Sequence, residues 1–96
     1  MSGAIIRKRL QFTGLVQGVG FRWHARRAAE ACGVTGWVRN EPDGSVSMEL
    51  QGSEAQIARV LEAIERGRYV RVEELRSREI PPRPDERGFV TRDDAW

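Results

Sequence analysis

Cysteine and histidine are almost absent from this sequence. Its 96 residues contain one of each, Cys32 and His24, so neither an intramolecular disulfide nor a cysteine–histidine metal cluster is expected. Long hydrophobic runs are absent too: no segment approaches the roughly 20 apolar residues that cross a bilayer. Charge appears too early in the N-terminal segment for a signal peptide. We therefore expect one soluble, cytoplasmic domain over residues 1–96, monomeric and without metal or cofactor.

Lysine is nearly missing, although the chain is rich in basic residues. Lys8 is the single lysine among 16 basic side chains, and 14 acidic residues balance them to a net charge of +2. Arginine suits two-pronged contact with phosphate or carboxylate, but such a balance indicates a surface of mixed charge rather than a nucleic-acid-binding face. We expect no nucleic-acid partner and no membrane partner.

Hydrophobic periodicity and turn residues predict five strands and two helices. We expect strands at residues 5–14, 34–40, 45–52 and 69–80 and a short one within 87–94, with helices at 21–32 and 54–66. The charges of the fourth strand suit a sheet edge. In the third strand, alternation turns Met48 toward the core and Ser47 and Glu49 outward.

This order of elements predicts a fold class. The sequence β-α-β-β-α-β with a short extra strand is typical of an α+β ferredoxin-like sandwich: an antiparallel sheet of four to five strands with two helices on one face. Many unrelated functions use this architecture, so the fold alone does not indicate an activity.

The two expected helices begin in opposite ways. The second has Ser53 as its cap, Gln56 to complete a capping box and Glu54 to complement the helix dipole. The first begins within GLVQGVGFRWH (residues 14–24), a stretch with three glycines and no acidic residue that places Arg22 in the first turn of the helix. Positive charge at this end opposes the dipole unless an anion occupies the space before the helix.

The residues alone support two interpretations of this loop. In one, the backbone amides of the loop surround an oxyanion and the Arg22 guanidinium adds two parallel donors; the residues involved are Gln17, Gly18, Val19, Gly20, Phe21 and Arg22. In the other, the glycines only form a tight strand-to-helix turn and Arg22 faces solvent. The loop is neither a nucleotide P-loop, since no Lys-Ser/Thr follows, nor a Rossmann fingerprint, since Trp23 replaces the third glycine.

Asn40 is the second candidate site residue. It ends an expected strand just before the turn EPDG, where Pro42 restricts the backbone. A carboxamide can accept from a water while donating to another group, which orients the water without adding charge beside a phosphate. The alternative is a turn-flanking asparagine that bonds its own backbone.

Two stretches resemble the signature segments of the acylphosphatase family. They are GLVQGVGFR (14–22) and GWVRNEPDGSVSMELQG (36–52), at the spacing of the family. The resemblance implies the ferredoxin-like fold and metal-independent hydrolysis of acyl phosphates, small molecules with a carboxyl–phosphate bond. It also implies that Arg22 and the amides of 17–22 bind the phosphoryl group, that Asn40 orients the attacking water, and that no cofactor takes part.

The resemblance leaves other functions open. Acylphosphatase-like domains also occur within larger hydrogenase-maturation proteins. The alternative is therefore a catalytically idle domain of the same fold, either one that binds phosphate or carbamoyl phosphate or a regulatory one. An RNA-binding domain would stack bases on aromatic side chains of its central strands, and the strand 45–50 has none. His24 is expected at the rim of the site rather than in the reaction.

Overall fold

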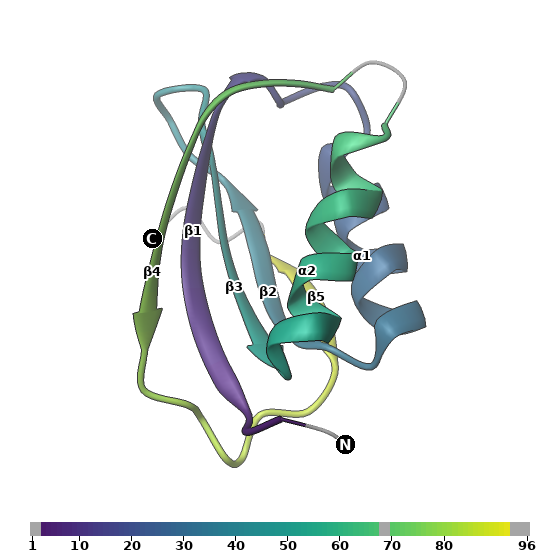
Figure 1. The fold of residues 1–96 in the computed structure, drawn as a ribbon. Coiled ribbons are helices and arrows are strands. Elements are labelled where there is room, and N and C mark those ends of the chain that lie inside the picture. Colours follow the sequence, from purple (N-terminus) through teal and green to yellow (C-terminus); the bar gives the residue numbers. More distant parts are fainter. Residues whose placement is uncertain (1–2, 68–69, 93–96) are drawn as a thin grey trace.

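The computed structural model describes residues 3–67 and 70–92, which form five strands and two helices. In chain order they are β1 Ile6–Leu15, α1 Phe21–Cys32, β2 Thr35–Asn40, β3 Val46–Gly52, α2 Glu54–Glu65, β4 Arg71–Ile80 and β5 Phe89–Arg92 (Figure 1). The predicted order is confirmed. The parts of the expected strands at residues 69 and 93–94 lie outside the described residues.

The strands form one sheet in the order β4-β1-β3-β2-β5. Four of them pair antiparallel as expected, and β4 lies at one edge. The prediction of an antiparallel sheet is wrong for β5, which pairs parallel to β2. The reason is visible in Figure 1: β4 ends at the end of the sheet where β2 begins, so the segment 81–88 crosses below the sheet and β5 then runs alongside β2.

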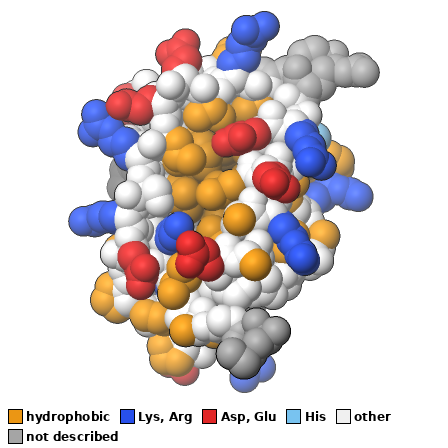
Figure 2. Space-filling model, viewed as in Figure 1, with side chains coloured by type: hydrophobic (Ala, Val, Ile, Leu, Met, Phe, Trp, Pro, Cys, Tyr) orange, Lys and Arg blue, Asp and Glu red, His pale blue; other side chains and the backbone are white. Residues whose placement is uncertain are grey.

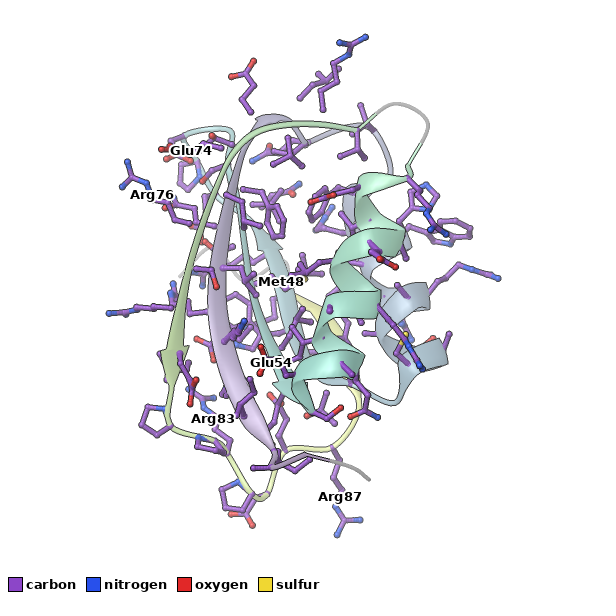
Figure 3. All side chains as sticks on the ribbon, in the orientation of Figure 1. Met48, Glu54, Glu74, Arg76, Arg83 and Arg87 are labelled. Atoms are coloured by element: carbon purple, nitrogen blue, oxygen red, sulfur yellow. The ribbon has the colours of Figure 1, made fainter. Side chains whose placement is uncertain are left out.

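Both helices cover one face of the sheet, and the core lies between the sheet and the two helices (Figure 1). Met48 on β3 points into this layer, whereas Glu74 and Arg76 on the edge strand point away from it (Figure 3). Figure 2 shows the hydrophobic side chains gathered between β4 and α2, with charged groups around them. Helix α2 buries Ile57, Val60 and Ile64 at helical spacing.

The starts of the two helices differ as the sequence predicts. The Ser53 side chain accepts from the Gln56 backbone N–H at 3.2 Å, and the Gln56 side chain accepts from the Ser53 N–H at 2.8 Å, which completes the capping box of α2. Helix α1 begins after Gly20, whose backbone is left-handed at φ 79°. Its first turn has no acid, and no side chain in the described part of the sequence caps it.

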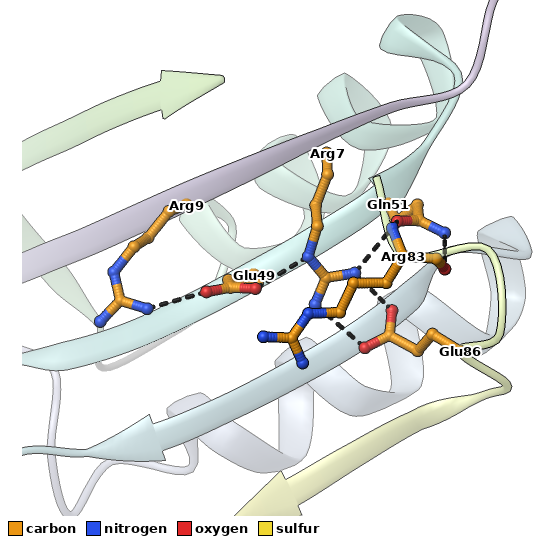
Figure 4. A network of polar contacts seen from close by, with 6 residues as sticks. All are labelled: Arg7, Arg9, Glu49, Gln51, Arg83 and Glu86. Carbon is orange, nitrogen blue, oxygen red and sulfur yellow. Dashed lines mark hydrogen bonds and ion pairs between the residues drawn. The ribbon is translucent and has the colours of Figure 1, made fainter. Parts of the chain in front are cut away.

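The face of the sheet opposite the helices is not the solvated face that alternation predicts. Ser47 and Glu49 do point away from the helices, but they are only 5% and 4% exposed. Glu49 accepts from Arg7 at 2.8 Å and from Arg9 at 2.8 Å (Figure 4). Arg7 is fully buried and also binds Glu86 in the segment after β4, at 2.7 Å and 3.0 Å.

These contacts shift two acid–base equilibria. Burial disfavours the charged form of Glu49, but its hydrogen bonds with Arg7 and Arg9 outweigh burial and lower the pKa of the carboxyl group. Burial likewise opposes the charge of Arg7, while Glu86 and Glu49 together raise the pKa of its guanidinium. Both shifts favour the charged forms of Glu49 and Arg7, so these two side chains form an ion pair near neutral pH.

Candidate active site

The loop between β1 and α1 is fixed at both ends by buried side chains. Val16 is fully buried before the loop and Phe21 is 1% exposed after it, with the Phe21 ring edge-on to Phe12 of β1 at 4.9 Å. Between them, Gly18 and Gly20 have φ values of 74° and 79°. These left-handed conformations favour glycine and turn the chain sharply from the sheet into the helix.

This turn leaves backbone donors available at the start of α1. The first backbone bond of the helix runs from the His24 N–H to the Gly20 carbonyl at 2.9 Å. Within residues 3–67 and 70–92, no backbone acceptor binds the N–H groups of residues 18–21. Donors of this kind, together with the positive end of the helix dipole, are suited to an anion.

Arg22 and Asn40 come from different elements and meet at this place. Arg22 lies in the first turn of α1 and Asn40 is the last residue of β2. Both line a hollow of about 190 Å³, together with Val16, Gly18, Gly20, Phe21 and Trp23. Larger hollows lie elsewhere on the described surface, for example about 430 Å³ beside the turn after β2, but they include neither Arg22 nor the glycine loop.

The side-chain oxygen of Asn40 does not bond the turn that follows it. Its Oδ1 is buried and has no hydrogen-bond partner among the described residues. The turn is instead closed by Asp43, whose carboxylate accepts from the Ser45 N–H at 2.9 Å and from the Ser45 hydroxyl at 2.6 Å. The hydroxyl bond is the largest cause of a lowered pKa at Asp43. A buried amide oxygen that has no partner among the described residues and lies beside a hollow is typical of a site that binds water or a ligand.

Gln17 has a role that the sequence did not indicate. Its side-chain N–H₂ donates to the Glu41 carbonyl at 2.7 Å and to the Ser45 carbonyl at 2.8 Å, so it joins the glycine loop to the turn after β2. The Gln17 side chain is therefore committed to the protein, and only its backbone is available to an anion. The sequence shows only a polar residue within a glycine loop. It does not indicate the partners of this residue, because they lie 24 and 28 residues away.

The loop residue Val19 and the neighbouring helix residues Trp23 and His24 lie in different surroundings. Val19 is partly buried against the core. The His24 ring lies close to the loop, since a Cβ added to Gly20 would be 3.6 Å from His24 Cδ2. His24 thus lies beside the loop, and its place outside the reaction stays a prediction. Trp23 is 58% exposed and its ring is edge-on to His24, with the centroids 5.0 Å apart.

The described residues contain no group of three histidine, cysteine or acidic side chains placed to hold a metal ion. Within the same part of the chain, both helices are too short and too polar to cross a membrane. Cys32, the single cysteine, is half-buried at the end of α1, far along the helix from the hollow.

The sheet order and the pair of helices place the protein among the α+β sandwiches of ferredoxin-like topology. The model of the acylphosphatase family matches residues 8–91, and the chain belongs to this family. An acylphosphatase of Leuconostoc mesenteroides is 46% identical over 70 residues, which cover 71% of this chain and 78% of that protein.

Solved structures agree with this assignment. The crystal structure of acylphosphatase from Bacillus subtilis superposes with a TM-score of 0.83 at 29% identity, over 90% of this chain and 97% of that one. Full-length HypF, solved in a phosphate- and nucleotide-bound form, superposes with a TM-score of 0.82 at 26% identity. The match covers 92% of this chain but only 12% of HypF, so the same fold also occurs as a small part of a much longer protein.

Proposed function

We propose that this protein is an acylphosphatase that works without a metal or cofactor. It adds water to an acyl phosphate and releases a carboxylate and dihydrogen phosphate. One observation carries the proposal: Arg22 and Asn40, on separate elements, line the same hollow at the uncapped start of α1. We also propose that the protein acts as a cytoplasmic monomer consisting of one domain over residues 1–96.

The phosphoryl group binds at the start of α1. The amides of residues 17–22 donate to its oxygens, and the dipole of the helix favours its negative charge. The Arg22 guanidinium adds two parallel hydrogen bonds. These donors are fixed before the substrate arrives, because Val16 and Phe21 hold both ends of the loop in the core. Fixed donors stabilise charge in the transition state without reorganising at the moment of reaction.

Asn40 orients the attacking water. Its amide is beside Arg22 in the hollow and has no partner for Oδ1 among the described residues. A water held by this amide attacks phosphorus while the bond from phosphorus to the acyl oxygen breaks. The acyl oxygen leaves as a carboxylate, and both protons of the water stay on the phosphate product. Because a carboxylate is stable at neutral pH, the leaving group needs no proton donor, and positioning with electrostatics suffices.

The alternative is a catalytically idle domain that binds phosphate or carbamoyl phosphate, or that regulates a partner. The likeness to 12% of HypF favours this second candidate, since there the fold is a small part of a longer protein. Such a domain would bind inorganic phosphate at the same loop but would not accelerate hydrolysis.

The test is a series of substrates with graded leaving groups, assayed in the presence of a chelator. We expect kcat/KM to fall by orders of magnitude from benzoyl and acetyl phosphate to aryl phosphates and again to alkyl phosphates. A departing alkoxide needs a proton donor, and among the described residues no acidic or histidine side chain lines the hollow. A flat series would contradict the proposed mechanism. Inactivation by the chelator would indicate a metal site, and phosphate binding without turnover would support the idle domain.

A further inference from the structure

Trp23 exposes a large apolar side chain at the edge of the candidate phosphate site. It is 58% exposed, more than Ile5, Leu15 or Val90, the other large hydrophobic side chains with high exposure among the described residues. Of these four, only Trp23 lines the hollow that contains Arg22 and Asn40. An exposed tryptophan is costly in water, and such residues are common at binding sites because one end is apolar and the other polar.

The indole is held in place rather than free to turn in solvent. The Arg27 guanidinium lies over the Trp23 ring, 4.9 Å from its centroid, one helical turn further along α1. The His24 ring meets the indole edge-on at 5.0 Å. Arg27 covers one face of the ring, so a ligand group entering the hollow can meet the other face or the ring edge.

The remaining lining of the hollow gives an acyl group little else to contact. Val16 and Phe21 also line it, but they are buried, at 0% and 1% exposed. The other lining residues are Gly18, Gly20, Arg22 and Asn40, which offer backbone or polar atoms. If the phosphoryl group occupies the loop amides, the acyl group attached to it extends outward, and Trp23 is the exposed apolar surface beside its path.

We propose that Trp23 determines acyl-group specificity and favours acyl phosphates with an aromatic or other large apolar acyl group over small ones. This inference rests on the proposed function, since it places the phosphoryl group at Arg22. A contact between two aromatic groups strengthens binding by up to about tenfold beyond the burial of area. The effect is expected in KM and in inhibitor binding, because Trp23 touches the acyl group and not the reacting phosphorus.

The kinetic test compares benzoyl phosphate with acetyl phosphate in Trp23→Ala. We expect the ratio of kcat/KM for the two substrates to fall about fivefold toward acetyl phosphate, mainly through KM for benzoyl phosphate, and Trp23→Phe to restore most of it. Val90→Ala, which truncates a 51% exposed residue of β5 outside the hollow, should leave the ratio unchanged. An unchanged ratio in Trp23→Ala would overturn the inference while leaving the hydrolase proposal intact.

A binding test separates this inference from turnover. Phenylphosphonate and methylphosphonate carry the same anionic group and differ in the group that Trp23 would contact. By calorimetry, Trp23→Ala should lose about fivefold in affinity for phenylphosphonate and little for methylphosphonate. Equal losses for both would show that Trp23 supports the loop instead, and would contradict the proposal even if the protein hydrolyses nothing.

Discussion

Arg22 stands in the first turn of α1, where a helix usually has an acid, and this turn contains no acidic residue. Near a helix N-terminus this arrangement costs a few tenths to about 1 kcal/mol. The cost becomes a gain when a phosphate dianion lies before the helix, because the dipole and the guanidinium then act on the same charge. The position of this one residue therefore predicts both a ligand and the chemistry of the ligand.

Replacement of Arg22 should remove activity even when positive charge is kept. We expect Arg22→Lys and Arg22→Ala each to lower kcat/KM for acetyl phosphate by at least about 100-fold, because an ammonium cannot form two parallel hydrogen bonds in a fixed plane. Arg26→Ala is the matched control, since it removes an exposed arginine of the same helix whose ion pair with Glu30 spans 3.3 Å. Wild-type rates in Arg22→Lys would place the site elsewhere.

Asn40 should affect turnover more than binding. Its proposed work is done in the transition state, so Asn40→Ala should reduce kcat about 100-fold while inhibition by inorganic phosphate changes less than about threefold. Steady-state kinetics with phosphate as competitor measures both quantities. If kcat and the affinity for inhibitory phosphate fell together, Asn40 would maintain the conformation of the loop rather than orient the attacking water.

At the scale of elements, the site depends on how closely β2 approaches β3. Gly36 pairs with Leu50, and a Cβ at Gly36 would overlap the carbonyl oxygen of Glu49. Its φ of 144° also lies in a region that other residues rarely adopt. Because Asn40 is the last residue of β2, a shift of this strand moves the candidate site as well as the sheet.

Gly36→Ala should therefore destabilise the fold strongly. We expect a loss of about 3 kcal/mol or more in the free energy of unfolding, measured with urea, from backbone overlap added to conformational strain. Gly88→Ala provides the comparison, since Gly88 has a φ of 72° but open space around the Cβ position. It should cost about 1 kcal/mol, the strain alone. Equal losses would mean that the strands separate without penalty.

The elements that the sequence predicts well are those determined by neighbouring residues. Ser53 and Gln56 form the predicted capping box because the two lie within one turn. The glycine loop and the turn after β2 were found for the same reason, and the family resemblance placed Arg22 and Asn40 together. Whether they perform the roles proposed for them is what the variants above will test.

The elements that were mispredicted depend on distant residues. Glu49 is buried by Arg7, which lies 42 residues away, and Arg7 is in turn bound by Glu86, which lies 79 residues away. Alternation along one strand indicates which face a side chain is on, but not what covers that face. The parallel pairing of β5 likewise depends on where β4 ends, which only the assembled sheet determines.

At the scale of the whole molecule, the ion network behind the sheet predicts how stability varies with pH. The pKa of Glu49 is lowered in the folded state, so the folded protein binds fewer protons at this group than the unfolded chain does. Its contribution is complete above the ordinary glutamate pKa of about 4.3 and is lost as the pH falls through the lower folded value. Arg7, with a raised pKa, stays charged over this range.

Glu49→Gln should make the protein less stable at pH 7. It should also reduce the fall in the free energy of unfolding that the wild type shows below a pH of about 4.3. We expect a decrease of about 3 kcal/mol at pH 7, because a buried guanidinium loses a charged partner. Glu74→Gln is the control: its pair with Arg76 is largely exposed, and it should change stability by less than about 1 kcal/mol. Urea titrations at several pH values measure both, and identical slopes for wild type and Glu49→Gln would contradict this account.

The place of β1 in the sheet also bears on how the chain folds as it is made. This strand is synthesised before both of its neighbours in the sheet, since β3 and β4 begin only at Val46 and Arg71. At about 5–20 residues per second, a strand with apolar Leu10 and Phe12 waits for seconds before any partner arrives. Arg7, Lys8 and Arg9 give the waiting segment three adjacent positive charges, which keep it in water and discourage pairing with other nascent chains. We therefore expect the arginines that later bind Glu49 and Glu86 to limit association of the chain during synthesis as well.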